Sequence, residues 1–472
     1  MNVLHEPAHG TLPDALGTAR LDRRDMLRRS AMGLAVPAAL ATAGLTRDQA
    51  VAQSASESGP GSLQTTREEL RMGGGLSQTR LERMHDVMAG HVESGFVPGL
   101  VTLVSRRGDT HVDVIGTTAF DSRDPMRRDT IFRIASVTKP IVAAAAMILV
   151  EEGTLRLDDP VDPLLPELAN RQVLRTIESP LDDTVPANRP ITLRDLLTFR
   201  LGYGAIFAAP GQYPIQAALE EAGFAAGPGL PTVPPDELME RYGNLPLLHQ
   251  PGEKWLYNTG SDILGVLIAR ATDMTLGEFL QERIFDPLGM KDTAFSVPAS
   301  KRDRLPAAYW TNFESGEFEV FDPTQDSRWA SPPAFESGAS GLVSTVDDLF
   351  AFAQIMLGNG KFGNERLLSR PAVALMTTDQ ITPEQKAASA SDFFPGFWDS
   401  NGWGFGVAIN TRRDNLATTP GRYGWDGGYG TSWYVDPAEE LIGILLTQRV
   451  WDAAGPLPTF DFWTSAYQAI DD

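Results

Sequence analysis

Ser136 and Lys139 stand three residues apart at the start of an apolar, alanine-rich run, in the stretch RIASVTKPIVAAAAMILVEEG that covers residues 133–153. Residues with this spacing share one face of a helix, so the two side chains are expected to lie within reach of each other. A serine hydroxyl becomes a nucleophile when a base takes its proton. A lysine in a dry pocket has a lowered pKa and can act as that base. The pair therefore predicts nucleophilic catalysis by a serine.

A purely structural interpretation of the pair is a helix N-cap serine followed by a surface lysine. Ser-x-x-Lys alone is a weak motif. The context favours chemistry, because Lys139 is the one lysine among six that follows a serine at this spacing, and apolar residues surround it. The α/β-hydrolase arrangement fails, because the chain has no G-x-S-x-G and no histidine after His249. The stretch SGASG at 337–341 comes closest to that motif and lacks its spacing.

The composition bounds the partners. The chain is 42% hydrophobic and 21% charged, which is typical of globular proteins, and its formal charge of −21 argues against nucleic acid or an anionic membrane surface. There are no cysteines, so disulfides and thiolate chemistry are excluded. An H-E-x-x-H match at residues 5–9 contains Pro7, which a zinc-binding helix would reject. We expect no metal and no cofactor.

The N-terminus is typical of an export signal. Arg23 and Arg24 precede a short apolar stretch and then Ala50-Val51-Ala52, which is the order of a basic region, an apolar region and a small-residue cleavage site. The paired arginine favours the twin-arginine route. We therefore expect residues 1–52 to be removed, the mature protein to be periplasmic or secreted without stable membrane insertion, and residues 53–76 to form a flexible linker.

The rest of the chain, residues 77–472, has strand patterns at both ends and helix patterns between them. A helix is predicted over 77–92, a β-hairpin follows around 107–109, and another helix begins at Thr192 and ends at Gly202. The simplest assembly is an α+β domain. One antiparallel sheet from both chain ends is flanked by helices, and a mostly helical region of about 155–340 is inserted.

Three short motifs then resemble a known group of enzymes. SVTK at 136–139, YNT at 257–259 and WDGG at 425–428 are similar, in order and separation, to the motifs of the serine β-lactamase and penicillin-binding-protein superfamily. The variant is similar to class C β-lactamases and family VIII carboxylesterases. The resemblance covers about residues 78–470 and implies a β-lactamase/transpeptidase-like fold.

The resemblance implies a role for each motif. Ser136 would be the acylated nucleophile, Lys139 its hydrogen-bonded activator and Tyr257 the general base, with a tyrosinate only if cations lower its pKa. The backbone N–H groups of Ser136 and Gly428 would form the oxyanion hole. The residues expected against the substrate are Thr259, Trp425, Asp426 and Gly427.

Two departures from the superfamily pattern bear on the substrate. Thr259 stands where the second motif usually has asparagine, and Trp425 where the third usually has lysine or histidine. An indole offers one N–H donor and no charge for a substrate carboxylate, although Arg422 is near enough in sequence to be a substitute cation. An aromatic, Gly/Pro-rich segment over 203–250 is expected to form a pocket wall or lid.

The sequence thus predicts a serine hydrolase that acts through an acyl-serine intermediate, with a small-molecule ester or amide as substrate. A carboxylesterase for neutral short-chain esters is favoured. The alternatives are a β-lactamase or D-alanyl-D-alanine carboxypeptidase, and a non-catalytic sensor domain that keeps the fold. The sequence does not determine the oligomeric state.

Overall fold

A computed structural model describes residues 73–224, 229–312, 315–390, 393–394, 396–451 and 458–472. The expected export signal, the H-E-x-x-H match and linker residues 53–72 lie outside this range. Residues 73–76 were expected to end the linker, but they pack on the domain. Leu76 is fully buried and forms an isolated β-bridge with Ile470. The folded domain therefore includes residues 73–76.

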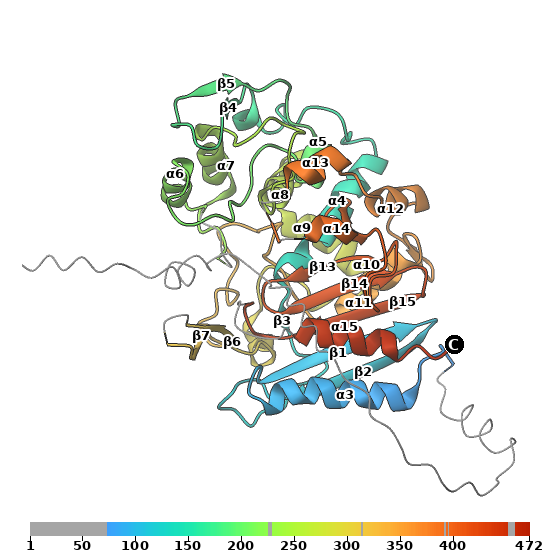
Figure 1. The fold of residues 1–472 in the computed structure, drawn as a ribbon. Coiled ribbons are helices and arrows are strands. Elements are labelled where there is room, and N and C mark those ends of the chain that lie inside the picture. Colours follow the sequence, from blue (N-terminus) through green and yellow to red (C-terminus); the bar gives the residue numbers. More distant parts are fainter. Residues whose placement is uncertain (1–72, 225–228, 313–314, 391–392, 395, 452–457) are drawn as a thin grey trace, which may run out of the picture.

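A seven-stranded antiparallel sheet forms the centre of the molecule, in the order β11-β12-β13-β14-β15-β1-β2 (Figure 1). Its strands are β1 (Gly99–Arg106), β2 (Asp109–Gly116), β11 (Asn401–Trp403), β12 (Ala408–Asn410), β13 (Tyr423–Gly427), β14 (Thr431–Asp436) and β15 (Leu441–Leu446). Strand β1 pairs with β15, so that Val101 faces Leu446. The prediction of one sheet built from both ends of the chain is confirmed.

Helices cover both faces of this sheet. On one face α3 (Gln78–Glu93) and α15 (Pro458–Gln468) pack together over an apolar layer. The other face carries a larger core that includes α4 (Thr138–Glu151), α8 (Thr259–Thr272) and α11 (Val346–Leu357). Helix α4 is buried from Thr138 to Leu149, because its alanines and branched residues leave no polar face.

The inserted region is mostly helical, as predicted, and also contains short hairpins. Its α-helices are α5 (Leu193–Leu197), α6 (Ile215–Glu221), α7 (Pro235–Asn244), α8 (Thr259–Thr272), α9 (Leu276–Leu280) and α10 (Asp286–Leu288). Two of the short strand pairs lie in the inserted region: β4 (Gln172–Leu174) with β5 (Thr184–Pro186), and β6 (Ala308–Thr311) with β7 (Phe318–Asp322). Outside it, β3 (Phe132–Arg133) pairs with β8 (Val343–Ser344), and β9 (Lys361–Phe362) with β10 (Glu365–Arg366). Three further helices follow: α12 (Arg370–Met376), α13 (Pro383–Ala388) and α14 (Phe397–Ser400).

The helix expected from Thr192 to Gly202 is shorter than predicted. Thr192 caps it, as its position suggests, but α5 ends at Leu197. Phe199 has a φ of +57°, which no right-handed helix accepts. The turn brings the Phe199 ring against Tyr257, with the ring centroids 5.8 Å apart.

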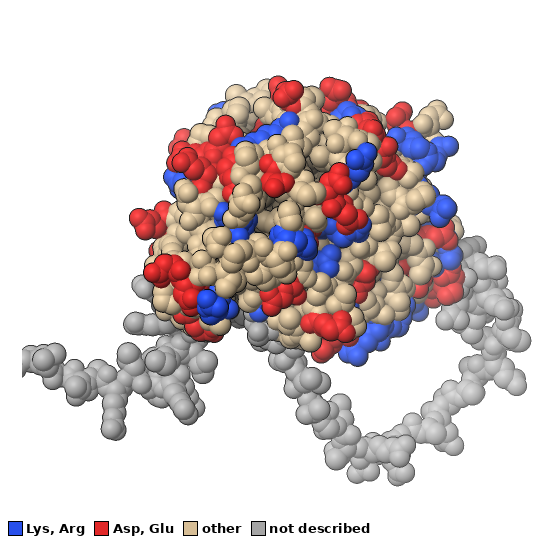
Figure 2. Space-filling view, turned by 90° about the horizontal axis from the view of Figure 1, so that it is seen from above, with Lys and Arg blue, Asp and Glu red and all other residues tan. Residues whose placement is uncertain are grey.

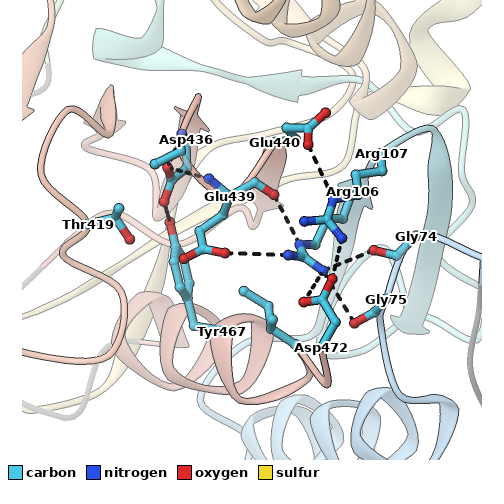
Figure 3. A network of polar contacts seen from close by, with 12 residues as sticks. Gly74, Gly75, Arg106, Arg107, Thr419, Asp436, Glu439, Glu440, Tyr467 and Asp472 are labelled. Atoms are coloured by element: carbon cyan, nitrogen blue, oxygen red, sulfur yellow. Dashed lines mark hydrogen bonds and ion pairs between the residues drawn. The ribbon is translucent and has the colours of Figure 1, made fainter.

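Arg106 connects distant segments at one edge of the domain (Figure 3). Its guanidinium is 2% exposed. It donates to the Gly74 carbonyl at 3.0 Å and the Glu439 carbonyl at 3.0 Å, and it pairs with the Asp472 carboxylate at 2.9 Å. A buried guanidinium needs several acceptors, and here they come from segments far apart in the sequence. Arg106 therefore ties the end of β1 to residue Glu439 just before β15, and to Gly74 and Asp472 near the two ends of the domain.

Acidic and basic side chains are interspersed among uncharged ones on the face in Figure 2. Within the described residues, no helix has the length and apolar character to cross a membrane.

Candidate active site

Ser136 lies in a 3-10 turn, Ala135–Val137, directly before α4. Ser136 was expected to share a helix with Lys139, but α4 itself begins at Thr138. Ala135 has a φ of +44°, an uncommon conformation for a residue with a side chain. The end of β13 supports this turn: a Cβ on Gly427 would lie 2.3 Å from the Ile134 carbonyl oxygen, so only glycine permits the approach. Strained backbone of this kind tends to cluster at functional sites.

Lys139 lies one helical turn after Ser136 and is fully buried. Its Nζ donates to Ser136 Oγ at 2.9 Å and to the Ala339 carbonyl at 2.8 Å. Burial lowers the pKa of Lys139 to about 7, while the charge of Asp262 acts in the opposite direction. A large fraction of this amine is therefore neutral near pH 7, and a neutral amine can accept the Ser136 proton.

Tyr257 reaches the same place from the start of α8. Asn258 has φ +83° and ψ −60°, and the Thr259 N–H donates to the Tyr257 carbonyl at 3.2 Å, which is the geometry of a rare γ-turn. The Lys139 Nζ lies 4.6 Å from the centre of the Tyr257 ring. The structure thus brings together the three residues that the motifs predicted as catalytic.

The condition for a tyrosinate, a lowered pKa of Tyr257, is not met in the structure. Burial raises the pKa of its phenol, and hydrogen bonds with Ser136 and Trp425 only partly oppose that effect. Lys139 lies over the ring instead of at the hydroxyl. Tyr257 is therefore a neutral phenol near pH 7, and Lys139 is the group poised to take a proton.

Trp425 is 6% exposed, and its Nε1 donates to the Tyr257 hydroxyl at 2.7 Å. The sequence placed this indole against the substrate. In the structure its one N–H is already engaged, so Trp425 supports Tyr257. Gly428 follows the strand, and a Cβ there would meet open space, as a position beside a substrate requires.

Asp426 and Arg422, which were expected near the substrate, lie on the side of β13 opposite to Trp425. Side chains alternate along a strand, so Asp426 faces away from Trp425. Its carboxylate accepts hydrogen bonds from Ser432 at 2.5 Å and from Tyr434 at 3.1 Å. Arg422 is buried on that same side, 3.8 Å from the Tyr434 ring centre, and is no substitute cation for the site.

Thr259 and Gly427 also have structural partners. Thr259 is buried and forms a hydrogen bond with Tyr242 of α7. Gly427 lies against Ile134, as described above. Both were expected to touch the substrate, and both are used in packing the walls of the site.

An aromatic cluster surrounds Tyr257 and Trp425. Its buried members are Phe199, Trp255, Tyr257, Ile381, Phe393, Trp403, Ala408 and Trp425, with Phe207, Phe394, Phe397 and Trp398 packed against them. Several come from 393–403, a stretch in which the sequence analysis predicted no site residue. The aromatic-rich letters FWDSNGW at 397–403 were the available signal.

The segment over 203–250 contributes less to the site than expected. Tyr203 and Phe224 pack on Tyr242, the latter stacked at 3.9 Å, and form a local core. Phe207 does reach the aromatic cluster, 6.4 Å from the Tyr257 ring centre. Leu230 packs against a separate apolar group that includes Ala135.

Asp262 is a further residue that the sequence analysis missed. It lies on α8, is 5% exposed, and its Oδ1 accepts from Ser337 Oγ at 2.6 Å and from the Ala339 N–H at 3.1 Å. An acid within the apolar run SDILGVLIA was the available signal, because a carboxylate is seldom buried without partners.

The chain matches the family model Beta-lactamase over residues 84–457. The chain belongs to the beta-lactamase family. Among similar proteins, Protein Rv1367c of Mycobacterium tuberculosis is 38% identical over 76% of this chain and 87% of its own length. Esterase EstB of Burkholderia gladioli is 32% identical, with 76% and 88% covered. Lovastatin esterase of Penicillium rubens is 33% identical, with 71% and 84% covered.

Solved structures agree on the beta-lactamase fold. EstCE1, described as a hydrolase with promiscuous acyltransferase activity, superposes with a TM-score of 0.68 at 24% identity and covers 83% of this chain and 99% of its own. At that identity the likeness concerns the fold alone. Together with the family match, the site describes a serine hydrolase of the beta-lactamase family.

Proposed function

We propose that this protein is a carboxylesterase for uncharged esters that works through an acyl-Ser136 intermediate. The observation that carries the proposal is the hydrogen bond from Trp425 to Tyr257. Trp425 thus has an indole at the position where the resemblance implies a cation, and this indole lies inside the aromatic cluster. A substrate carboxylate there would lose water without gaining a charged partner.

In this proposal, the neutral Lys139 amine takes the Ser136 hydroxyl proton as Oγ attacks the ester carbonyl. The backbone N–H groups of Ser136 and Gly428 receive the developing oxyanion. As the intermediate collapses, the leaving alkoxide takes one proton from the pair formed by Lys139 and Tyr257. Water then repeats the sequence on the acyl-enzyme, so that acid and alcohol are released and Ser136 is restored.

The relatives add support of a different kind. Two of the similar proteins are named as esterases, from a bacterium and from a fungus. The alignments with this chain cover 88% and 84% of the lengths of these two proteins. The aromatic surroundings favour an apolar substrate by burial at about 25 cal/mol per Å².

The test compares kcat/KM for p-nitrophenyl acetate and for nitrocefin on the wild type and on Ser136→Ala. We expect the ester to be preferred by about three orders of magnitude or more. Ser136→Ala should lose turnover of both substrates while its melting temperature stays near that of the wild type, because one hydroxyl is worth about 1 kcal/mol. Efficient nitrocefin hydrolysis by the wild type would favour a β-lactamase instead.

A further inference from the structure

We propose that Asp262 is a positioning residue for Lys139, acting through the loop Ser337–Gly341, and that it holds the Ala339 carbonyl toward the lysine amine. The proposal rests on the proposed acyl-Ser136 chemistry and deepens it. It assigns a use to a buried carboxylate that does not itself touch the nucleophile.

The connection runs through a single residue. The Ala339 N–H donates to Asp262 Oδ1 at 3.1 Å, and the Ala339 carbonyl accepts from Lys139 Nζ at 2.8 Å. A second contact fixes the loop, because Ser337 Oγ donates to the same Oδ1 at 2.6 Å. Asp262 therefore fixes the position of Ala339, whose carbonyl accepts the hydrogen bond from Lys139.

The loop has little freedom to take another position. A Cβ on Gly338 would lie 2.3 Å from the Ser261 carbonyl oxygen, so the loop backbone rests directly on α8. The Leu342 N–H donates to Thr138 Oγ1 at 3.2 Å, which ties the end of the loop to α4. The loop thus contacts both α8, which carries Asp262, and α4, which carries Lys139.

The orientation of the amine follows from this contact. A neutral lysine amine has two N–H bonds and one lone pair. If one N–H is held by the Ala339 carbonyl, the lone pair can be directed at Ser136 Oγ, which lies 2.9 Å away. Without that carbonyl the amine could rotate, and its lone pair would face Ser136 for only part of the time.

The charge of Asp262 has a second effect. The titratable groups that face Lys139 are Asp262 on α8 and Tyr257, and Asp262 in turn faces Tyr242 on α7. A nearby negative charge favours the protonated amine. Position and charge can be separated, because asparagine keeps the acceptor oxygen and loses the charge.

The experiment compares Asp262→Ala and Asp262→Asn with matched changes at Asp348 in the complete protein. Asp348 on α11 is also 5% exposed and also accepts from one N–H and one hydroxyl, those of Asp292 and Thr293. Hydrolysis of p-nitrophenyl acetate and the rate of Ser136 labelling by a fluorophosphonate are measured from pH 5 to 10. Circular dichroism checks that each variant is folded.

We expect Asp262→Ala to lower kcat by about 10- to 100-fold with little change in KM, because the amine loses its fixed orientation. Asp262→Asn should recover most of that loss and move the acid limb of the profile to lower pH by about half a unit or more. Asp348→Asn should leave the limb where the wild type has it.

Two results would overturn the proposal. One is an Asp262→Asn variant that, above its acid limb, loses as much kcat as Asp262→Ala although it keeps the acceptor oxygen. The other is an Asp262→Ala loss in kcat no larger than that of Asp348→Ala. If the wild type is not labelled at Ser136 at any pH, the acyl-enzyme proposal fails as well, and that outcome is distinct from the other two. If Asp262→Ala does not fold, kcat of Asp262→Asn decides, because a loss of about tenfold or more in that variant would contradict a role that needs only the acceptor oxygen.

Discussion

The indole Nε1 of Trp425 lies 2.7 Å from the hydroxyl oxygen of Tyr257, and both side chains are buried. The phenol is thus a hydrogen-bond acceptor from the indole, and its own proton remains free to be donated elsewhere. Trp425 of the third motif and Tyr257 of the second are therefore joined by a direct hydrogen bond.

Replacement of Trp425 by phenylalanine should lower kcat for an ester by about 5- to 10-fold, since one lost hydrogen bond is worth about 1 kcal/mol. Trp403→Phe is the matched control, because Trp403 is equally buried in the aromatic cluster and its Nε1 has no partner among the described residues. Equal losses in the two variants would mean that packing alone explains the effect.

A histidine at position 425 should change the substrate preference. Trp425→His keeps an N–H donor and can carry a charge, so the ratio of nitrocefin to ester turnover should rise. We expect a larger loss of stability for Trp425→Lys, because its ammonium would be placed in the aromatic cluster without a partner. The measurements are kcat/KM for both substrates and the melting temperature. An unchanged ratio in Trp425→His would show that residue 425 does not set the preference.

The pH dependence should follow Lys139. With a pKa of about 7, the amine is neutral above that pH and charged below it. As the pH falls, kcat/KM should therefore decline with a midpoint near pH 7 and reach a slope of about tenfold per unit. The pKa of Tyr257 is raised, so its phenol stays protonated throughout the range. Activity that rises only above pH 10 would instead assign the base to a tyrosinate or to an ordinary lysine.

Lys139→Ala and Tyr257→Phe should each lower kcat by about two orders of magnitude or more, and the double variant should lose much less than the product. The reason is that Lys139 lies 4.6 Å from the Tyr257 ring centre, and both groups take part in the proposed transfer of the Ser136 proton. A double-mutant cycle on kcat/KM measures the coupling. Fully multiplicative losses would contradict a shared proton-transfer network.

Export is proposed to depend on the arginine pair. Arg23→Lys combined with Arg24→Lys should leave unprocessed precursor in the cytoplasm, because the twin-arginine route reads both residues. Cell fractionation and intact mass measure the outcome. If a mature form that begins near Gln53 still accumulates outside the cytoplasm, the twin-arginine dependence is refuted.

The sequence could predict the sheet because strand alternation and terminal helices are local patterns. The spacing of Ser136 and Lys139 predicted their contact, because residues three apart share one face of a helix. Tyr257 is far from them in sequence, and only the resemblance to the superfamily motifs placed it beside them. The sequence did not reveal which side of β13 each residue faces. Asp426 and Trp425 are neighbours in sequence, but the pleat sends them to opposite faces.

The partners of Lys139 could not be predicted for another reason. The Ala339 carbonyl and Asp262 approach it through tertiary contacts between α4, α8 and a loop about 200 residues away, and a backbone carbonyl has no sequence signature. The neutral state of Tyr257 likewise follows from its burial in the aromatic cluster, which includes residues from 393–403. Those residues contact it only in the folded chain.

The pairing of β1 with β15 also bears on how the protein reaches its native state. Val101 meets Leu446 only after almost the whole chain is available, and pairings of such high contact order form slowly. Until then the β1–β2 hairpin has an unpaired edge, which can associate with other chains. Trp425 lies on β13 and Gly428 directly follows it, in the C-terminal part of the same sheet, so we expect Ser136 to acquire these neighbours only after that part has joined β1. Esterase activity during refolding would therefore report the completion of the sheet, and not merely the folding of the helix that follows the nucleophile.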